Sequence, residues 1–195
     1  MDRLAERSAS PLAAVSVVVV SAALSVLTGM LVGAALSVGG YSTVNPALGQ
    51  LLAGTHVLWP LVAVALLRRR GVATATALLA GLGEYLTGST HGWSVIVYSA
   101  FAGASIDVVW WLTRASARPY FYLLAGGISS AANVVIFKCA RAACLQAADL
   151  TVVVIATASA FASGVLLAGV VGALIVHVLR RIGLAGALAL PSTGH

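Results

Sequence analysis

Charge is the property that this sequence lacks most. Only 8% of its 195 residues are Asp, Glu, Lys or Arg, only five are acidic, and 61% are hydrophobic. Domains that fold in water carry about 25% charged residues, so this composition excludes an ordinary soluble domain. It is typical of a chain whose apolar runs reach the roughly 20 residues that a helix needs to cross a bilayer.

Six such runs divide the chain. We therefore predict an all-α membrane protein with six transmembrane helices, in a single domain over residues 1–195. The predicted spans cover residues 11–36, 48–67, 72–87, 93–113, 119–137 and 150–179. The third span is short and the sixth is long for a bilayer of ordinary thickness.

Basic residues are unevenly distributed between the two sides of this arrangement. Nine of the eleven fall on one side: Arg3, Arg7, Arg68, Arg69, Arg70, Arg114, Arg118, Arg180 and Arg181. Loops rich in Lys and Arg stay in the cytoplasm, so both termini of a multi-pass cell-membrane protein are predicted to be cytoplasmic. The net charge of +6 is thus a topology signal and does not indicate binding to nucleic acid.

Cysteine is also scarce. The two cysteines, Cys139 and Cys144, lie in the predicted external loop between the fifth and sixth spans. A disulfide in an oxidising compartment and two free thiols are both open interpretations. A metal site needs more ligands than this loop offers, so no metal is predicted.

The phosphate-binding loop Gly-x-x-x-x-Gly-Lys-Ser/Thr is absent from the sequence. That loop cradles the phosphates of ATP in many ATPases. If the chain takes part in active transport, an ion gradient or a separate ATPase must supply the energy. No cofactor is predicted for the chain itself.

Polar residues from four predicted spans share the outer half of the membrane. Glu84 is the most informative of them, because an ionisable side chain in lipid usually marks a ligand site or an ion pathway. The predicted substrate-binding residues are Glu84, His56, Trp93, Tyr98, Asn133, His91 and Gln50, with His56 about midway along its span. If they face inward, they line a cavity suited to a small polar or cationic ligand that carries a ring.

Simpler roles stay open for these side chains. Glu84 can pair with His91, and His56 can be a hydrogen-bonded packing residue. Asn133 can bridge helices, and Trp93 can belong to the aromatic belt at the membrane surface. The prediction of a ligand site therefore rests mainly on Glu84.

Small residues recur at every fourth position in the first and sixth spans, a pattern that lets helices approach closely. They are Ser21, Ser25, Gly29, Gly33 and Ser37 in the first span, and Ala156, Ala160, Gly164, Ala168 and Gly172 in the sixth. For the sixth span we favour packing inside the bundle. For the first span, internal packing and docking to another subunit through Ser25, Gly29 and Gly33 are equally favoured.

Asp107 lies in the inner part of the fourth span, away from the other polar residues. One interpretation is an ion pair with an arginine of a neighbouring loop. The other is a coupling role, in which Asp107 transmits ligand occupancy towards a cytoplasmic partner.

Two segments of the third and fourth spans together resemble a family signature. They are residues 83–92 (GEYLTGSTHG) and residues 102–107 (AGASID). The pair is similar to the signature of YkoE-type substrate-binding (S) components of energy-coupling factor (ECF) transporters. The sequence departs from that pattern at Ala102, where the family has glutamine, and at Asp107, where it has glutamate.

The resemblance implies an S-component-like bundle of six helices that captures a vitamin outside the cell. It further implies partners: a transmembrane coupling protein and ATPase subunits, which use the ATP. YkoE-like members are associated with thiamine or its hydroxymethylpyrimidine precursor. On this view Glu84 would bind the aminopyrimidine, Trp93 or Tyr98 would stack on its ring, and the small residues of the first span would form the docking surface.

Two other classes of function remain as alternatives. An ion-coupled secondary transporter of a small cationic or polar solute is the first, although no internal repeat of the kind common in such folds is evident. An intramembrane enzyme that uses Ser129 or Ser130 with His177 is the second. The sequence lacks a Gly-x-Ser-x-Gly elbow, so we predict that the protein is not an enzyme.

Overall fold

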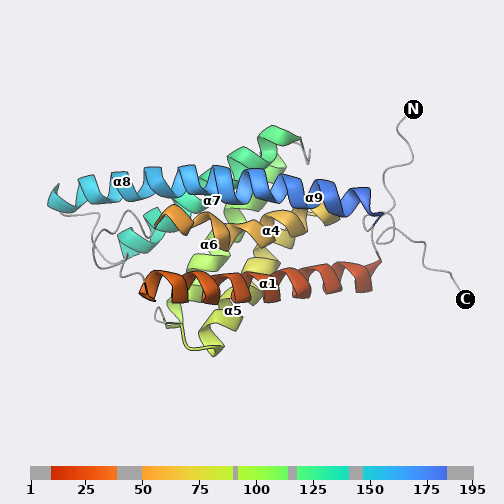
Figure 1. The fold of residues 1–195 in the computed structure, drawn as a ribbon, viewed down its shortest axis with the longest axis horizontal. Coiled ribbons are helices and arrows are strands. Elements are labelled where there is room, and N and C mark those ends of the chain that lie inside the picture. The colour runs from red at the N-terminus through yellow and green to blue at the C-terminus, as the bar shows by residue number, and fades with distance from the viewer. Residues whose placement is uncertain (1–9, 39–49, 90–91, 114–117, 141–146, 184–195) are drawn as a thin grey trace, which may run out of the picture.

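The computed structural model describes residues 10–38, 50–89, 92–113, 118–140 and 147–183, and within these ranges every regular element is a helix. The elements are α1 (Pro11–Val38), η1 (Gln50–Leu52), α4 (Gly54–Leu67), α5 (Val72–Leu86), α6 (Ser94–Leu112), α7 (Pro119–Ala140), α8 (Ala147–Ser163), η3 (Gly164–Val170) and α9 (Val171–Arg181). They form one elongated bundle (Figure 1). The all-helical fold predicted from the sequence is confirmed for these residues.

Five of the described helical segments are long and apolar enough to cross a membrane. They cover residues 11–35, 50–67, 94–112, 119–137 and 150–181. The remaining predicted span, the third (residues 72–87), corresponds to α5, which has 15 residues. At 1.5 Å per residue α5 is about 22 Å long, less than the roughly 30 Å of a hydrocarbon core. Gly71, at φ +78°, precedes its first residue, and Gly88, at φ +89°, lies in the turn that follows it.

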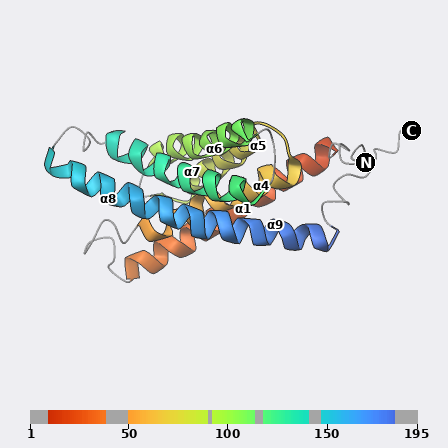
Figure 2. The same ribbon diagram turned by 90° about the horizontal axis from the view of Figure 1, so that it is seen from above.

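The helices alternate in direction, so α1 begins and α9 ends at the same end of the bundle (Figures 1 and 2). Basic residues gather at this end. The guanidinium of Arg180 donates a hydrogen bond of 2.8 Å to the carbonyl oxygen of Ala65, near the end of α4, and Arg68 follows that helix. We call this the arginine end; its placement in the cytoplasm stays a prediction from the charge pattern.

The core is built around α4, whose side chains from Val57 to Leu67 are almost all buried. This helix contacts α1, α5, α7 and α9. Trp110 and Phe121 pack edge-to-face beside it, with ring centroids 4.9 Å apart. A helical segment buried on nearly all sides needs an apolar sequence all round, which α4 has from Val57 onward.

The last span is one long helix whose middle, Gly164–Val170, is π-helical. There the backbones of Gly126 and Gly164 touch, because neither residue has a side chain to separate α7 from η3. The small residues predicted to pack inside the bundle are all buried: Ala156, Ala160, Gly164, Ala168 and Gly172. The packing interpretation of the sixth span is confirmed.

Two predictions concern residues that lie outside this description. Cys144 and the side chain of Cys139 are not among the described groups, and neither is His91. The disulfide and the role of His91 therefore stay sequence-based expectations.

Candidate functional site

A cavity of about 310 Å³ lies at the end of the bundle away from the arginine end. Side chains from α1, η1, α4, α5, α6 and α7 line it. Its polar lining includes five of the seven predicted substrate-binding residues: Gln50, His56, Glu84, Tyr98 and Asn133. The volume is at the lower end of the range for small-molecule sites.

The topology explains why these residues meet. His56 lies in the first turn of α4 and Glu84 in the last turn of α5. Because α4 and α5 are consecutive and antiparallel, the start of one helix lies beside the end of the next. His56 is the third residue of α4, but η1 precedes that helix within the same apolar segment, residues 50–67, so its depth in the membrane stays a prediction.

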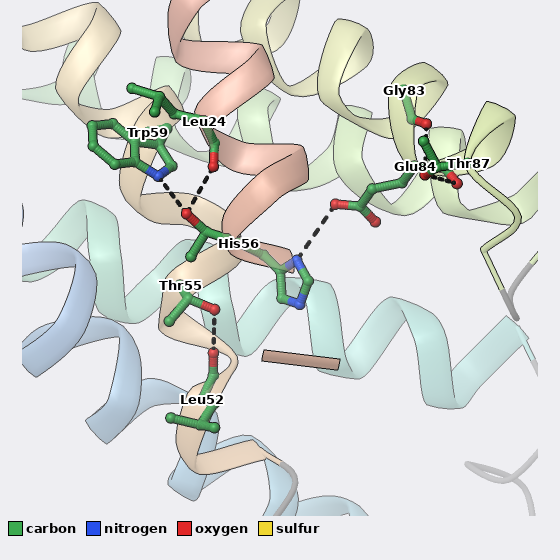
Figure 3. A network of polar contacts seen from close by, with 9 residues as sticks. Leu24, Leu52, Thr55, His56, Trp59, Gly83, Glu84 and Thr87 are labelled. Carbon is green, nitrogen blue, oxygen red and sulfur yellow. Dashed lines mark hydrogen bonds and ion pairs between the residues drawn. The ribbon is translucent and has the colours of Figure 1, made fainter. Parts of the chain in front are cut away.

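Glu84 and His56 form the charged centre of the cavity. Glu84 Oε1 lies 3.6 Å from His56 Nδ1, and the two side chains point toward one another from different helices (Figure 3). The carboxylate is 15% exposed and the imidazole 40%. Within the described residues the partner of Glu84 is thus His56. Pairing with His91, the alternative considered from the sequence, lies outside the described residues.

Ser163 holds the start of α4 in place. Its hydroxyl donates a hydrogen bond of 2.7 Å to the carbonyl of Leu51 and accepts one of 3.0 Å from the backbone N–H of Gly54. These two backbone groups lie at the junction of η1 and α4, where helical pairing is interrupted. Ser163 therefore supports the segment that carries Gln50 and His56 into the cavity.

Aromatic rings form a second wall of the cavity. Tyr98 of α6 and Phe137 of α7 are both cavity-lining residues, and their rings pack edge-to-face with centroids 5.2 Å apart and an interplanar angle of 79°. Ser129 donates a hydrogen bond of 2.6 Å to the carbonyl of Ala102, another cavity-lining residue, and so ties α7 to α6. Asn133 lies one turn after Ser129 on α7.

Trp93 does not line the cavity. Its side chain is 69% exposed, just before the start of α6. This position is typical of an aromatic residue at the membrane surface, which was the simpler of the two interpretations. The aromatic contribution to the cavity comes from Tyr98 and from Phe137, which the sequence analysis did not select.

The three residues predicted to form a docking surface on α1 have different surroundings. Ser25 is 2% exposed and lines the cavity. A Cβ atom added to Gly29 would lie 3.2 Å from Glu84 Oε1, so this residue also faces the site. Gly33 is exposed, with nothing within 4 Å of an added Cβ. Of the three, only Gly33 is open to a partner.

Asp107 lies away from the cavity and has a structural partner. Its Oδ2 accepts hydrogen bonds from the backbone N–H of Thr74, at 2.9 Å, and from the Thr74 hydroxyl, at 2.6 Å. Thr74 is the third residue of α5, and the first N–H groups of a helix have no partner within the helix. Among the described residues Asp107 makes no ion pair with an arginine, so neither sequence interpretation anticipated this contact.

Several lining residues were missed because they are small or apolar and carry no charge. They are Val32, Leu52, Ala53, Ala77, Ala80, Val95, Ser99, Val134 and Phe137. Small and apolar residues are common everywhere in this chain, so only the three-dimensional arrangement distinguishes them. Within the described part of the chain, no three His, Cys, Asp or Glu side chains gather into a metal-binding group.

A helical bundle with a polar cavity between its helices, in a chain this apolar, is typical of a multi-pass membrane protein that binds a small molecule. Comparison with known families makes this specific: residues 12–133 match the family described as "ABC-type cobalt transport system, permease component". The match covers more than half of the chain, which therefore belongs to this family. It is a component of a transport system in the cell membrane and not an enzyme.

A solved structure supports the same fold. The chain is similar to the crystal structure of an S component of an ECF transporter, with a TM-score of 0.74 over 90% of this chain and 86% of that chain. The two sequences are 22% identical, so this likeness concerns the fold. The prediction of an S-component-like bundle is confirmed. A search of curated protein sequences found no match.

Proposed function

We propose that this protein is the substrate-binding subunit of an ECF-type importer and that it holds a thiamine-like or hydroxymethylpyrimidine-like molecule in the cavity. The observation that carries the proposal is the Glu84 carboxylate beside His56, partly exposed, inside a cavity of about 310 Å³. A carboxylate kept in an apolar bundle needs a partner of opposite charge or several hydrogen bonds. An amino-substituted cationic ring offers both.

The chemistry of the lining suits an aminopyrimidine. The Glu84 carboxylate can accept charge-assisted hydrogen bonds from an exocyclic amine and a protonated ring nitrogen, and these are stronger than neutral ones. Tyr98 and Phe137 offer ring faces and edges against which a flat heterocycle packs. Gln50 and Asn133 add amide donors and acceptors for a hydroxyl or a second ring nitrogen.

The proposal includes separate partners that supply energy. The chain has no phosphate-binding loop, whereas its family is described as part of an ABC-type system. A coupling protein in the membrane and ATPase subunits in the cytoplasm would complete the importer. An ion-coupled secondary transporter and an intramembrane enzyme are both less well supported, because family and fold point to an ABC-type subunit.

Cobalt is the competing cargo, because the family description names it. A carboxylate and an imidazole, as in Glu84 and His56, are also groups that bind divalent first-row metals. The aromatic wall formed by Tyr98 and Phe137 favours the organic ligand, since it contributes nothing to a hydrated metal ion. The two cargoes make opposite predictions in a binding experiment.

Isothermal titration calorimetry on the purified chain in nanodiscs tests the proposal. Thiamine, hydroxymethylpyrimidine and CoCl2 are titrated in separate runs, with riboflavin as a ring-bearing control that has no cationic amine. We expect saturable binding of one of the pyrimidines and none of Co²⁺. Binding of Co²⁺ alone would show that the cargo is a metal ion. If neither pyrimidine binds, the substrate assignment is refuted.

A further inference from the structure

Gly29 of α1 lies directly against the charged centre of the cavity. A Cβ atom built on it would be 3.2 Å from Glu84 Oε1 and 3.4 Å from His56 Cε1. The first distance is shorter than most contacts of real Cβ atoms, so a side chain at this position displaces the Glu84 carboxylate by a few tenths of an ångström, whereas the second is an ordinary van der Waals contact. Glycine leaves the carboxylate where it is.

Two contacts of α1, both just before Gly29, fix this part of the helix against α4 and α5. The indole N–H of Trp59 donates a hydrogen bond of 2.9 Å to the hydroxyl of Thr28, which joins α1 to α4. Val26 packs so closely on Gly83 of α5 that a Cβ there would lie 2.7 Å from the valine methyl, so α1 cannot move closer to α5. The Glu84 carboxylate is the end of a flexible side chain, so an added side chain at residue 29 moves it more readily than it moves the helix.

We infer that Gly29 is a positioning residue of the binding site: it sets where the Glu84 carboxylate lies and thereby which ligands the cavity accepts. The ligand part of this inference rests on the proposed function, whereas the positional part rests on the contacts alone. A larger residue pushes the carboxylate away from α1, which lengthens its bonds to a bound amine. The same stripe of small residues that resembled a docking surface thus includes a wall of the site.

Gly33 provides a matched control on the same helix. It lies one turn further along α1, it is exposed, and nothing lies within 4 Å of a Cβ built on it. Alanine is favoured over glycine in any helix interior, so both substitutions gain the same contribution from helix propensity. A difference between Gly29→Ala and Gly33→Ala therefore reports the contact with Glu84 and His56.

Thermal melting in detergent tests the positional part without any ligand. Each alanine substitution is made in the wild type and in Glu84→Ala, which removes the carboxylate that Gly29 faces. We expect Gly29→Ala to raise the melting temperature more in the Glu84→Ala background than in the wild type, and Gly33→Ala to raise it equally in both. Equal effects of Gly29→Ala in the two backgrounds would overturn the inference.

Calorimetry with thiamine and hydroxymethylpyrimidine tests the ligand part. The loss of one good hydrogen bond to a charged group lowers affinity about tenfold or more. We expect a loss of this size for Gly29→Ala, no binding for Gly29→Leu, and wild-type affinity for Gly33→Ala and Gly33→Leu. Wild-type affinity of Gly29→Ala would overturn this part. If the wild type itself binds no pyrimidine, the proposed function fails and the melting experiment alone judges the role of Gly29.

Discussion

The carboxylate of Asp107 on α6 caps the N-terminus of α5 by accepting two hydrogen bonds from Thr74, one from the backbone and one from the hydroxyl. A negative charge at this position also interacts favourably with the helix dipole. The carboxylate of Asp107 therefore has a structural partner, the N-terminus of a helix. This differs from Glu84, whose carboxylate lines a cavity.

Replacing Asp107 with alanine is expected to destabilise the protein and to leave ligand affinity unchanged. Losing a cap of this kind costs about 1 kcal/mol, and the part-buried N–H of Thr74 loses its partner. The melting temperature in detergent measures the loss. Ser105→Ala is the matched control, because the Ser105 hydroxyl bonds only to the carbonyl of Phe101 in its own helix. A large fall in ligand affinity with an unchanged melting temperature would instead favour the coupling role that the sequence analysis considered for Asp107.

Glu84→Gln is expected to weaken pyrimidine binding about 10- to 100-fold, because the amide keeps the shape of the side chain and loses its charge. Calorimetry measures the change, and the melting temperature should not fall, since the buried charge is removed together with its desolvation cost. Tyr85→Phe serves as the control: it alters the next residue, whose side chain is exposed and outside the cavity. Wild-type affinity in Glu84→Gln would show that the carboxylate does not bind the ligand.

Much of the cavity could be predicted from the sequence, because two simple rules apply to this chain. Helices joined by short loops alternate in direction, and polar residues in a membrane turn inward. Together they bring Gln50, His56, Glu84, Tyr98 and Asn133 to one end of the bundle, as the structure has them. The rules depend only on the order of the spans and on the chemistry of each side chain.

The rotation of each helix could not be predicted in the same way. Helix α1 is apolar all round, so its sequence does not show that Ser25 and Gly29 face the cavity while Gly33 faces outward. The partner of Glu84 also depended on helix rotation, because the sequence alone does not show that His56 of α4 faces the end of α5. The π-helical segment Gly164–Val170 has no recognisable signal in its sequence.

Ser163→Ala is expected to lower both the melting temperature and the ligand affinity. The substitution leaves the carbonyl of Leu51 and the N–H of Gly54 without their partner, and an unsatisfied buried group costs about 1–3 kcal/mol. Because η1 and the first turn of α4 carry Gln50 and His56, their displacement should reach the cavity. Ser159→Ala, one turn earlier on the same helix, is the control for the loss of a hydroxyl. A lower melting temperature with unchanged ligand affinity would show that Ser163 stabilises the fold but does not support the binding site.

Gly33→Leu is expected to impair uptake and to spare binding. Gly33 is the one predicted docking residue that is exposed, and a small residue on an outward face allows close approach of a helix from another subunit. Uptake is measured in cells that also carry the coupling protein and ATPases, and binding on the purified chain. Affinity should stay within about twofold of the wild type, as is usual for a surface substitution away from a site. Ala158→Leu, which makes a similar change at an exposed position of α8, is the control and should support normal uptake. Normal uptake by Gly33→Leu would show that the coupling protein docks on another face.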